Sequence, residues 1–299
     1  MSLWVFATLF AASVQACRFY LQRRLSLSGL SPAAATFARF VYAPVPIAAG
    51  IGAWLLASGG ALPHVGDGFV GFALTGAVSQ VLATICVVAL FARRNFAVGI
   101  AFSKTAVLLT VVTGFVLLGE PVTPLALAAM GVGFAGVLLL SLPAGGGLGG
   151  NPVNVASALG LASGVFFSLS AVGYRGASLA IQSDAPLLRA AMTLCFVTLV
   201  QTAMLGAWLL WRDRAGLVAV FRGWRTSALV GATSLAGSMG WFTAYTLQTA
   251  AYVNAVGQVE LVLSMLLSRF ALGERQTARE LAGIALVGVS VLGLIVLRG

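Results

Sequence analysis

The sequence predicts an all-α membrane protein of ten transmembrane helices, arranged as two inverted five-helix repeats. The first observation is composition: 60% of the 299 residues are hydrophobic, only 8% are charged, and the mean hydropathy is +1.03. Soluble domains of this size are far less apolar. The second is that the apolar residues form ten separate runs, and the third is that landmark residues recur 154 positions apart.

Each apolar run approaches the roughly 20 residues that a helix needs to cross a bilayer. The first begins at Leu3 without a positively charged segment before it, which favours a membrane helix over a signal peptide. We expect helices at residues 3–22, 32–56, 69–92, 97–118, 124–142, 154–175, 186–211, 225–247, 252–271 and 279–297. The Gly/Pro-rich segment 143–153 is a predicted linker between a first repeat, 1–142, and a second repeat, 154–299.

The two repeats share landmarks without a shift in register. The corresponding positions are Pro32 and Pro186, Gly119-Glu120 and Gly273-Glu274, and Thr123 and Thr277. The prolines are expected at the first position of a helix, where a missing N–H costs little. Because each repeat holds an odd number of helices, the second copy is inverted in the membrane.

The same turn pattern precedes the last helix of each repeat. Gly119 and Gly273 are predicted left-handed helix ends, and Glu120 and Glu274 turn residues. Thr123, followed by a proline, is a predicted N-cap. Thr277, with a glutamate three residues later, forms a predicted capping box.

The arginines predict the orientation in the membrane. Arg23 and Arg24 lie in the first loop and Arg93 and Arg94 in the third, and the seventh and ninth loops are also basic. Odd loops are therefore expected in the cytoplasm and both termini outside. We expect an integral multi-pass protein of a plasma membrane, such as a bacterial inner membrane.

These features resemble the drug/metabolite transporter (DMT) superfamily, and most closely its EamA-like ten-helix branch. The resemblance rests on Gly119-Glu120-Pro-Val-Thr123 followed by three glycines, on Gly273-Glu274-Arg-Gln-Thr277 followed by two, and on the ten spans. It implies transport by alternating access and says little of the substrate. Two features differ from this family. Many members keep both termini in the cytoplasm, whereas the termini here are predicted outside. The small multidrug-resistance branch has a membrane glutamate in its first helix, where this chain offers Gln15.

Three charges inside apolar runs are the first candidates for substrate binding. Lys104, the one lysine of the chain, and Arg39 each lie roughly 10 Å inside a predicted helix. A charge at this depth costs at least about 2.5 kcal/mol, so both cations can hold an anionic group. Glu260 enters from the other side and can meet a substrate amine or carry a coupling proton. Alternatively, Glu260 pairs with one cation and backbone carbonyls satisfy the other.

Neutral residues extend this candidate site. The amides are Gln258, Asn254 and Gln80, whose alternative role is hydrogen bonding between helices. Trp241 and Tyr245, four residues apart, share a helix face on which a planar substrate can stack, unless they face lipid.

Residues near span ends are expected at the membrane interface. Aromatic residues anchor helices there, and arginine reaches it with its long side chain. This group consists of Arg18, Tyr20, Tyr174, Trp4, Trp208, Trp211 and Trp224.

Other function classes find no support in the sequence. His64 is the one histidine and is placed in a loop, which excludes a histidine-based metal site or a Ser–His catalytic pair. Cys17, Cys86 and Cys195 fall in or beside apolar runs, so we expect neither disulfide nor metal site, and no cofactor. The net charge of +10 is spread over short loops, which does not suit nucleic acid.

We therefore expect a transporter and not an enzyme, acting as a monomer or a loose homodimer. The first expectation is export of an amino acid or other small polar metabolite. Lys104, helped by Arg39, would hold its carboxylate, and Glu260 would bind its amine or carry a coupling proton. The alternative is an exchanger of phosphorylated or otherwise anionic metabolites. A lipid flippase is a further alternative, because the basic residues can admit a lipid phosphate.

Overall fold

The computed structural model describes residues 2–27, 30–90, 103–141, 155–263 and 277–298. Within these ranges the chain is helical, and no strand forms; Val65 and Ile181 make one isolated bridge. This confirms the predicted helical class, and the long apolar helices agree with a membrane protein.

The helices follow one another with short connections. Their bounds are α1 Leu3–Leu27, α2 Pro32–Phe40, α3 Pro44–Ser58, α4 Phe69–Leu90, α6 Ala106–Leu118, α7 Pro124–Ser141, α8 Val155–Leu179, α9 Pro186–Arg212, α10 Arg214–Arg222, α11 Trp224–Leu247, α12 Ala250–Gly257 and α14 Ala278–Arg298. Most bounds lie within a few residues of the predicted ones.

Five helical stretches of the described chain are long and apolar enough to cross a membrane. They are Pro32–Ser58, Phe69–Leu90, Ser157–Leu179, Pro186–Arg212 and Ala278–Leu297. Four shorter apolar helices accompany them: Leu3–Arg18, Ala106–Leu118, Pro124–Leu140 and Ala250–Leu263. The predicted spans 97–118 and 252–271 lie partly outside the described residues, and so does most of the linker 143–153.

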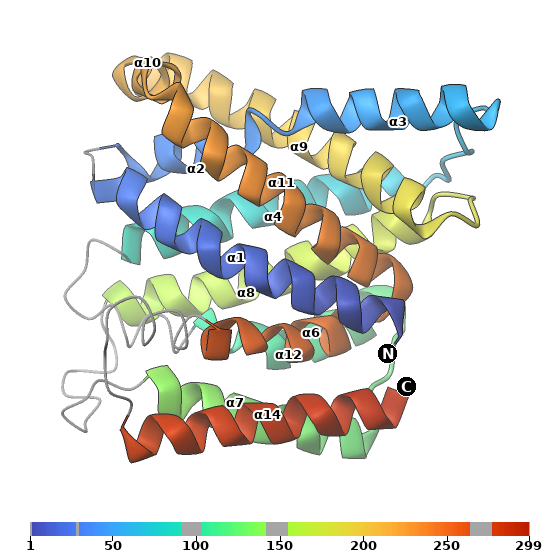
Figure 1. Ribbon diagram of the computed structural model, residues 1–299, viewed down its shortest axis with the longest axis vertical. Coiled ribbons are helices and arrows are strands. Elements are labelled where there is room, and N and C mark those ends of the chain that lie inside the picture. The colour runs from blue at the N-terminus through green and yellow to red at the C-terminus, as the bar shows by residue number, and fades with distance from the viewer. Residues whose placement is uncertain (1, 28–29, 91–102, 142–154, 264–276, 299) are drawn as a thin grey trace.

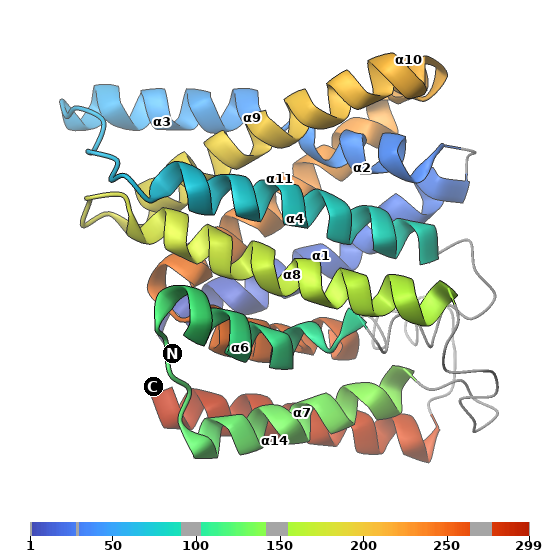
Figure 2. The same cartoon turned by 180° about the vertical axis from the view of Figure 1, so that it is seen from behind.

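The predicted helix 32–56 is interrupted, which corrects the expectation of one continuous span. α2 ends at Phe40 and α3 begins at Pro44. Proline has no N–H to donate to the carbonyl four residues earlier. The N–H of Ala43 instead donates a hydrogen bond to the carbonyl of Phe40 at 3.0 Å. The break lets α2 pack inside the bundle while α3 lies along its edge against α9 (Figures 1 and 2).

The connection between α9 and α11 contains a short helix, α10, where a loop was expected. The Asp213 carboxylate accepts a hydrogen bond from the N–H of Gly216 at 2.8 Å and thereby caps α10. The other carboxylate oxygen accepts one from the Ser31 hydroxyl at 2.6 Å. Ser31 is itself the N-cap of α2, so one carboxylate joins the starts of two helices.

The helices of the two chain halves pack in pairs. α1 lies along α11, and α8 lies along α4 (Figures 1 and 2). α7 lies along α14, and α6 contacts α12. α1 and α8 run in opposite directions, and both termini emerge at one end of the bundle (Figure 1). Exchanging each helix for the counterpart that the predicted repeat assigns to it leaves this pairing unchanged.

Several predicted helix ends are confirmed. Pro32 and Pro186 begin α2 and α9. Gly119 ends α6 in the left-handed conformation, with a φ of 66°. The hydroxyl of Thr123 accepts a hydrogen bond from the N–H of Ala126 at 3.4 Å at the start of α7. Gly273 and Glu274 lie outside the described residues.

The predicted capping box at the last helix is also confirmed. The N–H of Thr277 donates to the carboxylate of Glu280 at 2.7 Å, and the N–H of Glu280 donates to the Thr277 hydroxyl at 3.3 Å. Two N–H groups that the helix leaves unpaired are thus satisfied.

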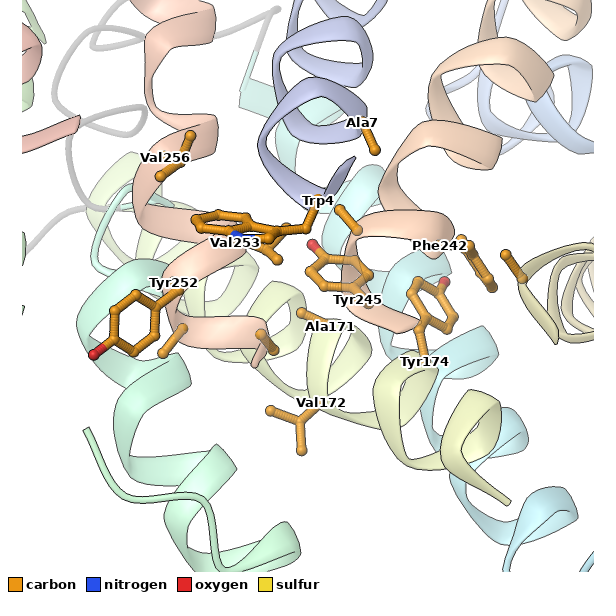
Figure 3. Close-up of a cluster of buried hydrophobic side chains, with 14 of the residues drawn as sticks. Trp4, Ala7, Ala171, Val172, Tyr174, Phe242, Tyr245, Tyr252, Val253 and Val256 are labelled. Carbon is orange, nitrogen blue, oxygen red and sulfur yellow. The ribbon is translucent and has the colours of Figure 1, made fainter. Parts of the chain in front are cut away.

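An aromatic cluster lies at the centre of the apolar core (Figure 3). Tyr174 packs on Phe242 with ring centroids 4.2 Å apart, and Trp4 and Tyr245 belong to the same buried cluster. The expected interfacial roles of Trp4 and Tyr174 are therefore wrong. Their sequence positions near helix ends gave no sign that other helices of the bundle cover them. Trp208, Trp211 and Trp224 are exposed on the helix surfaces, as a lipid-facing role requires.

Candidate functional site

Two helices are interrupted at corresponding positions, and the candidate site lies there. The N–H of Val107 donates to the carbonyl of Lys104 at 3.3 Å, which makes a tight turn just before α6. The N–H of Leu261 donates in the same way to the carbonyl of Gln258 at 3.0 Å, just after α12. Gln258 and Leu261 lie 154 positions after Lys104 and Val107, so the two turns occupy corresponding positions of the predicted repeats. Tight turns inside a helix frequently mark functional positions, and in transporters interrupted helices line substrate sites.

Glu260 follows the second interruption and binds side chains from two other helices. One carboxylate oxygen lies 3.9 Å from the ammonium nitrogen of Lys104. The other accepts a hydrogen bond from the amide of Gln15 on α1 at 2.6 Å. The carboxylate is buried, while the lysine side chain is about one fifth exposed. Lys104 is therefore paired loosely, and a ligand oxygen can compete for it.

Trp241 of α11 completes this part of the site. Its indole N–H donates to the carbonyl oxygen of the Gln15 amide at 3.0 Å. Gln15 thus accepts from Trp241 and donates to Glu260, which fixes the orientation of its amide. The indole lies directly over Gly257, where a larger residue would collide with it.

Gln258 is buried without a hydrogen-bond partner for its side chain. It is 4% exposed, and both its amide oxygen and its amide nitrogen lack a partner among the described residues. Its amide lies close to Gly133 of α7. Leaving such groups unsatisfied costs about 1–3 kcal/mol, so this amide is available to a polar ligand.

Arg39 holds a second cluster on the other side of the site. Its guanidinium donates to the hydroxyls of Ser234 on α11 and Thr84 on α4, each at 3.0 Å. Thr84 receives a further, weaker contact from Gln80 at 3.5 Å, and Gln80 accepts a hydrogen bond from Ser170 at 3.1 Å. Of the described carboxylates, none lies within ion-pair distance of Arg39.

Arg18 connects the two clusters. Its expected role, as a side chain that reaches the membrane interface, is wrong. Its side chain is 4% exposed inside the bundle, so it does not extend along a lipid-facing surface. It interacts electrostatically with both Arg39 and Glu260. It lies one helical turn after Gln15, on the same side of α1. That spacing was the signal in the sequence: a charged residue three positions after Gln15, on the same side of the helix.

Tyr245 and Asn254 form a third polar contact, next to the others. The Tyr245 hydroxyl donates to the Asn254 amide oxygen at 2.7 Å, and the amide nitrogen donates to Thr110 of α6 at 2.9 Å. The rings of Trp241 and Tyr245 stack with centroids 6.0 Å apart. The predicted shared face is confirmed, and it points into the protein.

The charges of this region do not balance. Two cations, Arg39 and Lys104, lie near one described carboxylate, that of Glu260. Arg39 and Glu260 are buried, where charge imbalance is far less screened than at a surface. The arrangement can therefore bind an anion. The described residues contain no group of three metal-ligating side chains.

Comparison with known proteins places the fold. No family model matches the sequence, and no curated protein sequence matches it. Twenty-three chains of solved structures share its architecture. A crystal structure among them matches 97% of this chain and 96% of its own length with a TM-score of 0.70, at 18% sequence identity. At that identity the likeness establishes the fold and leaves the substrate open.

Proposed function

We propose that this chain is a secondary transporter of small polar metabolites that carry an anionic group. In this proposal ten membrane helices form two inverted halves around a central site that opens alternately to either side. The exchangeable packing of α1 on α11 and α8 on α4 supports the inverted repeat. The matching interruptions at Lys104 and Gln258 support a site between the halves.

The observation that carries the proposal is the buried excess of positive charge. Inside a membrane protein an ionisable side chain is costly, and those retained usually serve a substrate or ion pathway. Here Arg39 and Lys104 outnumber the one described carboxylate beside them, Glu260. A bound anion would offset the excess, which favours a substrate with a carboxylate or phosphate.

An amino acid fits the pair of Lys104 and Glu260. The 3.9 Å separation leaves the pair open to insertion. The substrate carboxylate would take Lys104, and the substrate amine would take Glu260. Export of amino acids is the first form of the proposal.

A phosphorylated or otherwise dianionic metabolite is the second form, favoured by Arg39. No carboxylate of the described chain lies within ion-pair distance of Arg39, and arginine binds phosphate with paired donors. In this form Glu260 stays paired with Lys104, and no proton is needed.

The orientation belongs to the same proposal. Arg212, Arg214, Arg222 and Arg225 lie at the end of the bundle opposite both termini (Figure 1). By the positive-inside rule this end faces the cytoplasm and the termini face outside. A reporter fused to the C-terminus that is active only outside the cytoplasm tests this.

The deciding experiment is counterflow into proteoliposomes. Purified protein is preloaded with unlabelled amino acids or with sugar phosphates, and labelled substrate is followed with and without a pH gradient. The variants are Lys104→Ala, Arg39→Gln and Glu260→Gln. Asp184→Asn, at an exposed loop position, is the matched control.

Each form of the proposal predicts its own pattern. The amino-acid form predicts counterflow that is lost in Lys104→Ala and kept in Asp184→Asn. The anion form predicts counterflow of phosphates that is lost in Arg39→Gln and insensitive to the pH gradient. If Lys104→Ala and Arg39→Gln both keep full counterflow of amino acids or of sugar phosphates, the assignment of the site is wrong.

A further inference from the structure

A second charged feature lies far from the candidate site, at the junction of α9, α10 and α11. We call it the arginine–tryptophan corner, and it consists of Arg212, Arg214, Arg222, Arg225, Trp211 and Trp224. All six side chains are exposed. Figure 1 shows α10 at an outer corner of the bundle, at the end opposite both termini.

The charge of the corner is not neutralised within the described protein. The nearest acid in sequence is Asp213, whose two oxygens accept from the Gly216 N–H and the Ser31 hydroxyl. The described ion pairs involve none of the four arginines. Four cations within fourteen residues therefore face the surroundings with one acid among them.

Apolar side chains stand beside the guanidinium groups. Trp211 is 73% exposed and Trp224 58%. The guanidinium of Arg212 lies 3.9 Å from the ring centroid of Trp211, and that of Arg225 lies 5.8 Å from the ring of Trp224. Val218 and Phe221 are exposed on α10. Indoles sit at the level of lipid headgroups, where basic and apolar side chains can lie side by side on one helix face.

We propose that the arginine–tryptophan corner binds the headgroups of anionic phospholipids. The charge selects the phosphate and an anionic headgroup, and the exposed rings enter the adjoining acyl region. A soluble anion would need the arginines but not the rings. A nucleic acid would need a broad basic surface without apolar side chains directed at lipid. The proposal does not depend on the transport activity.

The test measures lipid retained by the full-length protein. Native mass spectrometry counts lipids bound to protein purified in detergent with added phosphatidylglycerol or phosphatidylcholine. The test variant replaces all four arginines with glutamine, and a second replaces them with lysine. Arg298→Gln, which removes an arginine at the opposite end, is the control. Inorganic phosphate in excess serves as a competitor.

The wild type is expected to retain phosphatidylglycerol and little phosphatidylcholine. Near a membrane surface each arginine contributes roughly a fivefold gain in binding, so the glutamine variant should lose at least tenfold. The lysine variant should keep most of the binding, because it keeps the charge. Arg298→Gln should match the wild type. Trp211→Ala with Trp224→Ala should weaken lipid binding without changing its headgroup preference.

Three results would overturn the proposal. The first is equal retention of both lipids by the wild type. The second is undiminished phosphatidylglycerol binding by a folded glutamine variant. The third is displacement of the lipid by inorganic phosphate, which would assign the corner to a soluble anion. If the glutamine variant does not fold, the wild type and the lysine variant still decide the question. Both should prefer phosphatidylglycerol to phosphatidylcholine and should keep it in the presence of inorganic phosphate.

Discussion

Arg175 and Glu120 form an ion pair that joins α8 to the turn between α6 and α7. The same guanidinium donates to the backbone carbonyls of Tyr245 and Gln248, each at 2.8 Å. One side chain therefore connects α8 with the turn after α6 and with the end of α11. Glu120, predicted as a turn residue, is also the counter-ion of this arginine.

Replacing Glu120 with glutamine should destabilise the protein. It leaves a largely buried guanidinium without its carboxylate, which costs about 1–3 kcal/mol. The apparent free energy of unfolding in an SDS titration measures the loss. Glu280→Gln, at the exposed capping box, is the control and should cost less than about 1 kcal/mol. Equal losses in both variants would show that the ion pair contributes nothing specific.

Replacing Gly119 with alanine should also destabilise the protein. Its φ of 66° lies in the left-handed region, where a side chain costs roughly 1–2 kcal/mol. No atom lies within 4 Å of the added methyl group, so the loss would come from the backbone and not from a collision. Gly131→Ala is the matched control, because it has equal space inside α7 and no positive φ. That variant should be unchanged or slightly more stable.

Gly173 sets the spacing between α8 and α4. A methyl group there would lie 2.8 Å from the backbone nitrogen of Gly76 and 2.8 Å from the carbonyl oxygen of Phe72. Backbone atoms cannot rotate away, so Gly173→Ala should force the helices apart and cost about 1–3 kcal/mol or more. Gly288→Ala, in open space on α14, should leave the thermal melting temperature unchanged. A Gly173→Ala protein as stable as the wild type would contradict the close packing.

Local signals in the sequence predicted the helix ends well. Pro32, Pro186, Thr123 and the capping box at Thr277 act on neighbours within one turn, and the structure confirms each. Pro44 could have predicted the break between α2 and α3, because its missing N–H is also a local property. The length of the apolar run, 32–56, had instead suggested one continuous helix.

Long-range contacts were beyond the reach of local patterns. Arg18 was expected to lie at the interface because basic residues follow it in the chain, yet it is buried in the bundle, where the charges of Arg39 and Glu260 act on it. Tyr174 is buried because Gly76 of α4 leaves room for its ring. The depth of Lys104 and Glu260 in their helices did predict that their charges could meet, and the structure brings them to 3.9 Å.

The contact between Trp241 and Gly257 offers a test of the candidate site that leaves its charges intact. A methyl group on Gly257 would collide with the indole and push it away from Gln15. Gln15 would then lose the acceptor contact that orients its donation to Glu260. If Glu260 serves the substrate, counterflow should fall roughly tenfold, which corresponds to one net hydrogen bond.

Trp241→Phe removes the same N–H by another route and should lower counterflow to a similar extent. Because both changes act through one hydrogen bond, the double variant should be no worse than either single one. Additive losses would show that Gly257 and Trp241 influence transport independently, and the ordering role of Gln15 would then be wrong.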